Sequence, residues 1–211
     1  MAKRQTKLVE DEPSKPYHHG ALREALLVAA EQILERDGMV GLTLRAAARE
    51  AGASHAAPKN HFGDLTGLLS ELAAVGYDRF TTRLLAAAEG LTTPQKRLNA
   101  IGRAYVEFAI ANPGLFQLMF RSERLDTARP ALRDQMERSG RMLSGAVSAA
   151  HPEMPSESAA PASPSARIVR AWAMVHGYTM LLLDAQLDAI LGEEPCGADP
   201  MLLLDAMLAL D

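Results

Sequence analysis

Hydrophobic residues recur at the spacing of an amphipathic helix through most of the chain, and no segment alternates hydrophobic and polar residues as a half-buried strand does. The first such stretch covers residues 17–37 and ends at Gly38, which suits the C-terminal stop of a helix. The sequence therefore predicts an all-α fold. Further helices are expected at 64–88, from 93 onward, around 113–120, from 130 onward, at 166–191 and from 199 onward.

Several of these helices begin at a side chain that can accept a free backbone N–H group. Asp64, Thr93 and Asp199 are each expected as N-caps. Proline follows Thr93 and Asp199 directly, at the first helical position, where its missing N–H is not needed. Residues 151–165 contain four prolines and no periodicity, which predicts a linker or surface loop.

The last helix is apolar nearly all round at Met201, Leu202, Leu203 and Leu204. A short helix of this kind must be covered on every side. Cover from a second subunit is the economical explanation, so we expect a homodimer through the last two long helices. Full burial within one chain is the alternative.

Residues 42–62 predict two short helices joined by a tight turn. Thr43 can cap the first helix, and Gly52 stands where a helix ends and the backbone needs positive φ. Ser54 is expected to cap the second helix. Helix, glycine turn and capped helix within about 20 residues is the helix-turn-helix plan.

The second of these helices carries the candidate chemistry for DNA. Lys59 can neutralise a phosphate, and Asn60 can pair with the edge of adenine. The alternative is a helical corner that binds nothing, because many two-helix corners contain a glycine. The exposed side is expected to present only small, basic or amide residues: His55, Ala56, Ala57, Lys59, Asn60 and His61.

Composition limits the other classes of protein. The chain has 211 residues and no uncharged apolar run of about 18, so we expect no membrane span. The basic start lacks the apolar region of a secretory signal, and the single cysteine, Cys196, fits a reducing cytoplasm. The net charge of −4 is uneven, because residues 1–63 sum to +1 and the rest to −5. Residues 1–16 are expected as a flexible basic arm, with a plain disordered tail as the alternative.

The sequence gives little support to an enzyme. Its six histidines show no metal-ligand spacing, and it contains no glycine-rich phosphate loop or Gly-x-Ser-x-Gly elbow. We therefore expect no metal, no cofactor and no catalytic residue. Two alternatives stay open: an all-α enzyme, and a helical ligand-binding or scaffold protein with weakened DNA binding.

Several motifs resemble the TetR family of bacterial transcriptional regulators. Over residues 17–80 these are Tyr17-His18-His19-Gly20, Leu42-Thr43-Leu44, Ala51-Gly52-Ala53-Ser54 and His61-Phe62. The run Ser54-His55-Ala56-Ala57-Pro58 is similar to one branch of that family. That branch carries a Trp…His-Gly signature, which here is Trp172 and His176-Gly177, and Asn112-Pro113-Gly114-Leu115-Phe116 also fits it.

The resemblance implies a DNA-binding domain at 17–63 and an effector-binding and dimerisation domain at 64–211. The helix from Ser54 to His61 would lie in the major groove of each half-site of a roughly palindromic operator. Ala53 and Phe62 would pack inward. The implied DNA contacts are Thr43 and Arg45 to the backbone, Ser54, His55, Ala56, Ala57 and Asn60 to base edges or nearby phosphates, and Lys59 and His61 to phosphates.

The chain departs from the family's pattern at three places. The family usually has tyrosine where Lys59 stands, and lysine then often glutamate where Leu65 and Thr66 stand. Pro58 lies four residues after the expected N-cap, where it would remove a helical hydrogen bond and distort the first turn. Weaker operator binding is the expected result.

The resemblance also implies a pocket for a small hydrophobic or aromatic effector whose binding releases the repressor from DNA. Trp172, His176, Thr179 and Leu183 recur on one helical face. The alternative is a filled helical core in which His176 is a buried, hydrogen-bonded histidine. Candidates to face that helix across a pocket are Tyr105, Phe108, Phe116, Met119, Phe120 and Met142.

Overall fold

The computed structural model describes residues 19–152, 163–188 and 199–209, and within these ranges the secondary structure is helical throughout, as predicted. The N-terminal helices are α1 (His19–Gly41), α2 (Leu44–Glu50) and α3 (Ala57–Phe62). The larger group comprises α4 (Leu65–Ala88), α5 (Pro94–Ala111), α6 (Pro113–Met119), the short 3₁₀ turn Ser122–Arg124, α7 (Pro130–Ala150), α8 (Pro164–Leu183) and α10 (Pro200–Leu208). The expected arm, most of the 151–165 linker, and Cys196 lie outside the described residues.

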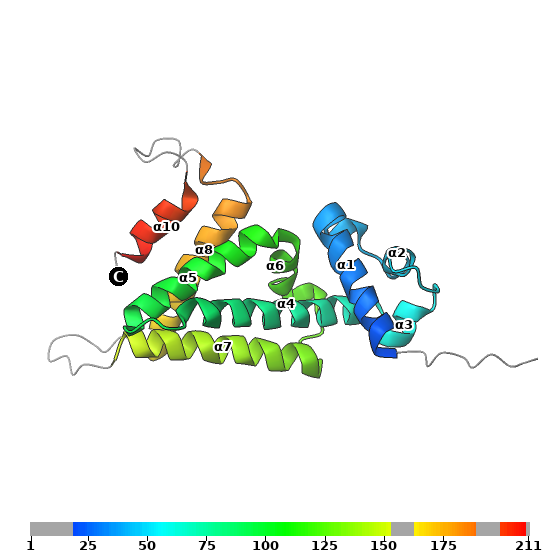
Figure 1. Ribbon diagram of the computed structural model, residues 1–211, viewed down its shortest axis with the longest axis horizontal. Helices are drawn as coiled ribbons and strands as arrows, with labels where there is room; N and C mark the ends of the chain where they lie inside the picture. The colour runs from blue at the N-terminus through cyan, green and yellow to red at the C-terminus, as the bar shows by residue number, and fades with distance from the viewer. Residues whose placement is uncertain (1–18, 153–162, 189–198, 210–211) are drawn as a thin grey trace, which may run out of the picture.

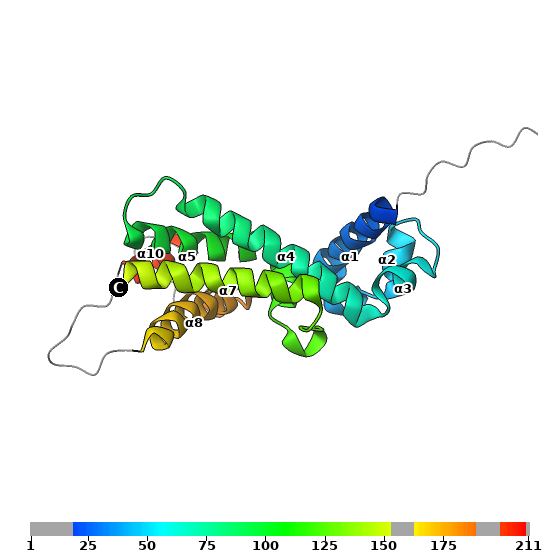
Figure 2. The same ribbon diagram turned by 90° about the horizontal axis from the view of Figure 1, so that it is seen from below.

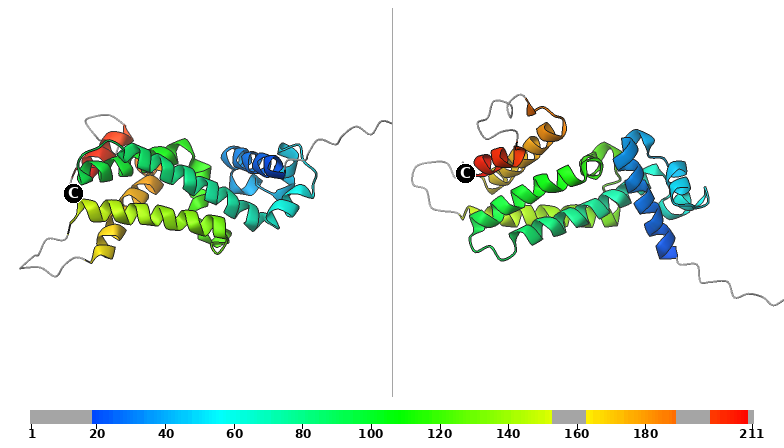
Figure 3. Two further views of the ribbon diagram at one scale, coloured as in Figure 1. Left: turned by 60° about the horizontal axis from the view of Figure 1, so that its bottom comes forward. Right: turned by 45° about the horizontal axis from the view of Figure 1, so that its top comes forward.

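The N-terminal helices α1–α3 lie at one end of the elongated molecule, and α4 runs from them along the rest of it (Figure 1). Helix α7 runs beside α4, with which it makes extensive contact (Figure 2). Helix α10 lies against α5, and α8 packs on both α5 and α7 (Figure 3). Helix α4 therefore runs through both groups, and α1 also packs against α6.

Four of the five predicted N-caps are confirmed. The side chain of Asp64 accepts from Gly67 N at 2.8 Å, and that of Thr43 accepts from Ala46 N at 3.1 Å. Thr93 accepts from Lys96 N at 3.3 Å, and Asp199 accepts from Met201 N at 2.8 Å. Each bond satisfies a backbone donor that has no partner inside its helix.

The two glycines expected to stop helices both have positive φ. Gly38 interrupts α1 at φ 68°, and Gly52 ends α2 at φ 62°. After α2, Ala53 N donates to Ala48 O at 2.8 Å and Gly52 N donates to Arg49 O at 3.2 Å. This pair of bonds is the Schellman motif, in which glycine is the favoured left-handed residue.

Helix α8 ends at Leu183, so the prediction that it runs to about residue 191 is wrong. The chain leaves the helix through Ala185, whose φ is 53°. Gln186 N donates to Leu181 O at 2.8 Å and Ala185 N donates to Leu182 O at 3.1 Å, which is again a Schellman motif. Alanine occupies the left-handed position here, and no glycine marked this end in the sequence.

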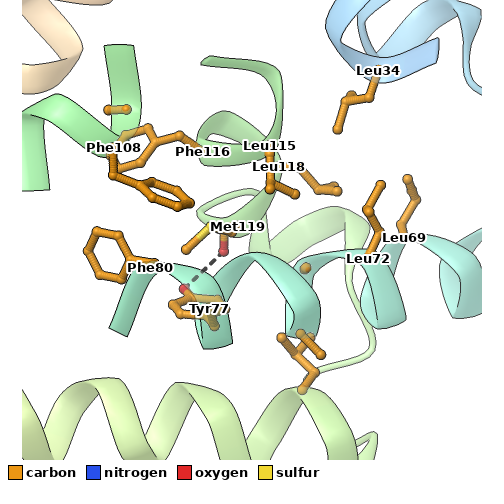
Figure 4. Packing of buried hydrophobic residues seen from close by; sticks show 14 of the residues in the cluster. Leu34, Leu69, Leu72, Tyr77, Phe80, Phe108, Leu115, Phe116, Leu118 and Met119 are labelled. Atoms are coloured by element: carbon orange, nitrogen blue, oxygen red, sulfur yellow. Dashed lines mark hydrogen bonds between the residues drawn. The ribbon is translucent and has the colours of Figure 1, made fainter. Parts of the chain in front are cut away.

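One contiguous hydrophobic core extends from α1 to α10. Its centre lies where α4 meets α6 (Figure 4), and there the hydroxyl of Tyr77 donates to the carbonyl of Met119 at 3.0 Å. Phe80 packs edge-on against Phe108, with ring centroids 5.2 Å apart. Among the described residues, helix α10 is covered on one side only, because Leu204 is buried while Leu202 remains 49% exposed.

Candidate nucleic-acid interface and effector cavity

Helix α3 sits in a corner formed by α1, α2 and α4. Phe62 is buried at its end, as predicted, and Ala47 and Ala48 are buried on the facing side of α2. Arg23 of α1 lies over the Phe62 ring, 5.6 Å from its centroid. The orientation of α3 is therefore set by a packed core, not by loop contacts.

The start of α3 differs from the prediction. The helix begins at Ala57, with Ala56 as an N-cap that offers no side-chain bond, so Ser54 is not the cap. Instead, Ser54 O accepts from Ala57 N at 3.0 Å in the turn before the helix. Pro58 thus falls within the first turn, where an N–H has no helical partner. The expected distortion by Pro58 is wrong.

Most of the predicted DNA contacts present their side chains to solvent. Ala57 is the correction: it is only 6% exposed and belongs to the core, so it cannot reach a base edge. His61 is half-buried beside Phe62. The exposed members of the set are Thr43, Arg45, Ser54, His55, Ala56, Lys59 and Asn60. Their contacts with DNA stay predictions.

Two carboxylates of the N-terminal helices are paired with an arginine. Arg36 at the end of α1 pairs with Glu50 of α2 at 3.1 Å and with Asp37 at 3.0 Å. The Arg36 guanidinium lowers the pKa of the Glu50 carboxyl, mainly through this hydrogen bond. Glu50 is thus held against Arg36 in an ion pair at the end of α2, while Arg45 and Lys59 stand exposed on the candidate surface.

A group of three side chains ties α3 to the rest of the molecule. Arg129, just before α7, donates to the carbonyl of Phe62 and to the carboxylate of Glu71, both at 3.2 Å. Glu71 on α4 also pairs with Arg23 on α1. Gly67 is required here, because a Cβ at this position would lie 2.0 Å from Phe62 O.

The Asn112–Phe116 motif makes a second tie, between α6 and α1. The carboxylate of Glu35 accepts from Gly114 N at 3.1 Å and from Leu115 N at 2.9 Å. These are free donors in the first turn of α6. A Cβ at Gly114 would approach Leu34 O to 3.0 Å, so glycine permits the close contact.

The larger group of helices forms a partly open cavity of about 400 Å³, lined by residues of α4, α5, α7, α8 and the end of α10. This volume is in the range of cavities that hold a drug-sized molecule. Four of the predicted residues line it: Tyr105, Phe120, Met142 and Trp172.

Other predicted pocket residues do not line this cavity. Phe108, Phe116 and Met119 are buried in the surrounding core. Thr179 is fully buried, and its hydroxyl donates to Val175 O at 2.7 Å within its own helix. Helical spacing identified the faces that turn inward, but these positions face packed side chains instead of the void.

His176 is half-buried beside the cavity and is held by Tyr105. The Tyr105 hydroxyl lies 2.8 Å from His176 Nδ1, and the Phe120 ring centroid lies 4.7 Å from the imidazole. Burial lowers the pKa of His176 and raises that of Tyr105. A neutral imidazole with its proton on Nε2 accepts this hydrogen bond at Nδ1, and one with its proton on Nδ1 donates to the hydroxyl oxygen. In either tautomer His176 is hydrogen-bonded, which matches the alternative of a hydrogen-bonded histidine in the core.

The prediction missed the polar part of the wall. Gln95 and Asn99 of α5 and Ser139 of α7 line the cavity. Gln95, Asn99 and Gly102 follow the i, i+4, i+7 spacing, so the periodicity of α5 contained the signal. The other missed wall residues are apolar or aromatic, among them Tyr77, Phe80, Leu98, Met136, Leu143, Ile168, Val169 and Met174.

Within the described ranges, no cluster of histidine, cysteine and carboxylate side chains could hold a metal ion. None of the helices placed there is both long enough and apolar enough to cross a membrane.

Two solved structures share this fold over most of the chain. A solved structure of a protein with unknown function from Rhodococcus sp. RHA1 is 35% identical, with a TM-score of 0.74, covering 93% of this chain and 96% of that one. The structure of AibR in complex with isovaleryl coenzyme A and operator DNA shares the fold, with a TM-score of 0.60 and 17% identity over 90% of this chain and 97% of that one.

Among curated proteins, the uncharacterized HTH-type transcriptional regulator YobS of Bacillus subtilis (strain 168) is 29% identical over 101 residues. That match covers 46% of this chain and spans about half, 51%, of the regulator. The family model of the tetracyclin repressor-like C-terminal domain matches residues 98–208, which is more than half of the chain. The protein therefore belongs to the tetracyclin repressor-like, or TetR, family of transcriptional regulators.

Proposed function

We propose that the protein binds a roughly palindromic DNA operator as a homodimer and that a small hydrophobic effector in the cavity releases it. The observation that carries the DNA part is the exposed surface of α3 and the start of α2. It presents Lys59, Asn60 and Arg45 to solvent, while the neighbouring Glu50 is paired with Arg36. Positive charge and an amide on one exposed helix suit phosphate contact and base readout.

Family membership answers the alternative of an all-α enzyme, since the family is one of transcriptional regulators. AibR, which shares the fold, is described with operator DNA. For the present chain, operator binding rests on the α3 surface and on this likeness together.

Exposed apolar side chains on α8 and α10 support the homodimer. Val169 and Leu181 of α8 are 57% and 47% exposed, and Leu202 of α10 is similarly open to solvent. Four of the eight exposed large apolar side chains of the described residues, Trp172 included, lie on these two helices, and a group of exposed apolar residues marks an interaction surface more often than scattered ones do. A second copy of the same surface would bury them in a two-fold arrangement.

Helix α4 supplies the route from effector to DNA. Tyr77, Phe80 and Leu84 of α4 line the cavity, and the same helix begins three residues after Phe62, the last residue of α3. A ligand that favours one position of α4 would shift the population of α3 positions in the dimer. A ligand that binds both arrangements equally would have no effect on DNA binding.

The experiment is a titration of the protein against DNA from its own upstream region at several salt concentrations, read by fluorescence anisotropy. We expect affinity to fall steeply with salt, and the double variant Lys59→Ala with Asn60→Ala to lose most sequence-specific binding. Lys96→Ala, at an exposed position on α5, is the matched control. Absence of binding at low salt, or an unaffected double variant, would favour the scaffold alternative.

A further inference from the structure

The cavity wall, as far as the structure describes the chain, contains no charged side chain. Among the described residues that line it, none is Asp, Glu, Lys, Arg or His. An anionic ligand would therefore find no cation to replace its water, and a buried ion without a partner is strongly disfavoured.

The polar side chains of the wall form an ordered chain of hydrogen bonds. Asn99 Nδ2 donates to the carbonyl of Leu208 at 3.3 Å, and Gln95 Nε2 donates to Asn99 Oδ1 at 2.9 Å. A carbonyl only accepts, so Leu208 fixes the orientation of Asn99, and Asn99 then fixes that of Gln95.

These hydrogen bonds use the amide nitrogen of Gln95 and leave its side-chain oxygen, Oε1, without a partner among the described residues. Gln95 also lines the cavity. The amide therefore offers a bound molecule an acceptor. A carboxylate brings only acceptors to this position, whereas a hydroxyl or N–H group brings the donor that the amide lacks.

We propose that the cavity binds an uncharged, mostly apolar molecule that carries a hydroxyl or N–H donor, and that Gln95 receives this donor. The inference deepens the proposed function, because it defines the effector class for the same cavity. It also sets this chain apart from AibR, whose described ligand is a coenzyme A ester bearing phosphates.

Trp172 provides an intrinsic fluorescence probe of the cavity. Trp172 is the only tryptophan in the sequence and lines the cavity, where it is 42% exposed. Its fluorescence therefore reports occupancy of the cavity without DNA. Calorimetry on the same samples measures the affinity independently of the tryptophan.

The test compares three ligands of equal chain length at neutral pH: n-octanol, methyl hexyl ketone and n-octanoate. We expect n-octanol to bind tightest and to change the Trp172 emission. The ketone is neutral but lacks a donor, so it should bind several-fold more weakly, by roughly the worth of one hydrogen bond. Octanoate should bind at least about tenfold more weakly, since its charge is left without a partner.

Two further variants locate the ligand and the polar contact. Gln95→Lys places a cation in the wall and should reverse the preference, so that octanoate binds more tightly than n-octanol. Gly140→Leu narrows the cavity and should abolish binding, because Gly140 lines it and has open space at its Cβ position. Gly145→Leu is the matched control on α7: its Cβ position is also open, but it does not line this cavity.

Octanoate binding as tight as that of n-octanol, or no binding of any of the three ligands by calorimetry, would overturn the proposal. Equal binding of the alcohol and the ketone would refute the role of Gln95. None of these readouts contains DNA, so failure of operator binding in the anisotropy titration remains a separate result.

Discussion

Arg129 donates a hydrogen bond to the backbone carbonyl of Phe62 at 3.2 Å, across the junction between α7 and the end of α3. The same guanidinium pairs with Glu71 on α4. The residue that precedes α7 therefore holds both the last residue of the candidate recognition helix and the helix that leads to the cavity. This contact ties the position of α3 to the arrangement of the larger helices.

We expect Arg129→Met to destabilise the fold by about 1–3 kcal/mol, because it removes charge-assisted hydrogen bonds at a partly buried site. Arg23 still neutralises Glu71 in this variant, which limits the loss. If the contact also transmits the effector signal, the substitution should leave the operator affinity of the effector-free protein nearly unchanged. The fall in operator affinity that the effector causes should then be clearly smaller than in the wild type. Urea unfolding and operator titrations with and without n-octanol measure the two effects.

The control is Arg133→Met, one turn further along α7, where the arginine pairs with Asp134 in solvent. Exposed pairs of this kind contribute little to stability. A control variant that matched Arg129→Met in both unfolding and release would show that the contact with Phe62 has no special role.

Replacing Ala185 by glycine should stabilise the protein by about 0.5–1 kcal/mol. A residue with a Cβ is strained at a φ of 53°, and relief of that strain exceeds the entropy that glycine adds to the unfolded chain. Ala173→Gly is the opposite case, because it lies inside α8 at an exposed position and should destabilise by about 1 kcal/mol. Thermal or urea unfolding gives both values, and two changes of the same sign would contradict the assignment of strain to Ala185.

The end of α8 also shows what local sequence can and cannot reveal. Thr43, Asp64 and Asp199 were predictable as caps because an N-cap depends on one side chain and the few residues after it. Ala185 adopts a left-handed conformation that its own side chain disfavours, and the hydrogen bonds of the Schellman motif hold it there. No local pattern carries that information.

The candidate sites divide in the same way. Exposure of Lys59 and Asn60 followed from the motif, but burial of Ala57 depends on how α3 is rotated against α1 and α4. Periodicity correctly assigned Phe108 and Thr179 to inward faces. It could not distinguish a face that meets packed side chains from one that meets a void, because that depends on the volumes of distant residues.

The stability of the fold should depend on pH through His176. Burial lowers the pKa of His176 in the folded state, so the unfolded chain binds more protons as the pH falls. The neutral histidine contributes fully to the free energy of unfolding above pH 6.5, roughly the pKa of histidine in the unfolded chain. This contribution is lost as the pH falls from there through the lower pKa that His176 has in the folded state. We expect His176→Asn, which keeps an acceptor for Tyr105, to show a smaller loss of stability on acidification.

Urea unfolding of both proteins at pH values above and below this range measures the difference. Tyr105→Phe serves as the companion variant, because it removes the hydroxyl that lies 2.8 Å from Nδ1 but leaves the imidazole to titrate. Parallel pH profiles for the wild type and His176→Asn would show that burial of this histidine does not govern acid stability.

Lys59 and Asn60 should affect DNA binding in different ways, although they are adjacent on α3 and both exposed. Lysine neutralises a phosphate whatever the base sequence, so Lys59→Ala should weaken specific and non-specific binding alike and reduce the salt slope of log K by about 1. Truncating an amide that contacts a base costs about 1–3 kcal/mol of binding free energy, and this cost arises at one operator position. The salt slope should change little. Asn60→Ala should therefore lower affinity for the operator while leaving affinity for random DNA nearly intact. Anisotropy titrations of both variants on operator and scrambled duplexes separate the roles, and a change in salt slope for Asn60→Ala alone would mean that the two assignments are reversed.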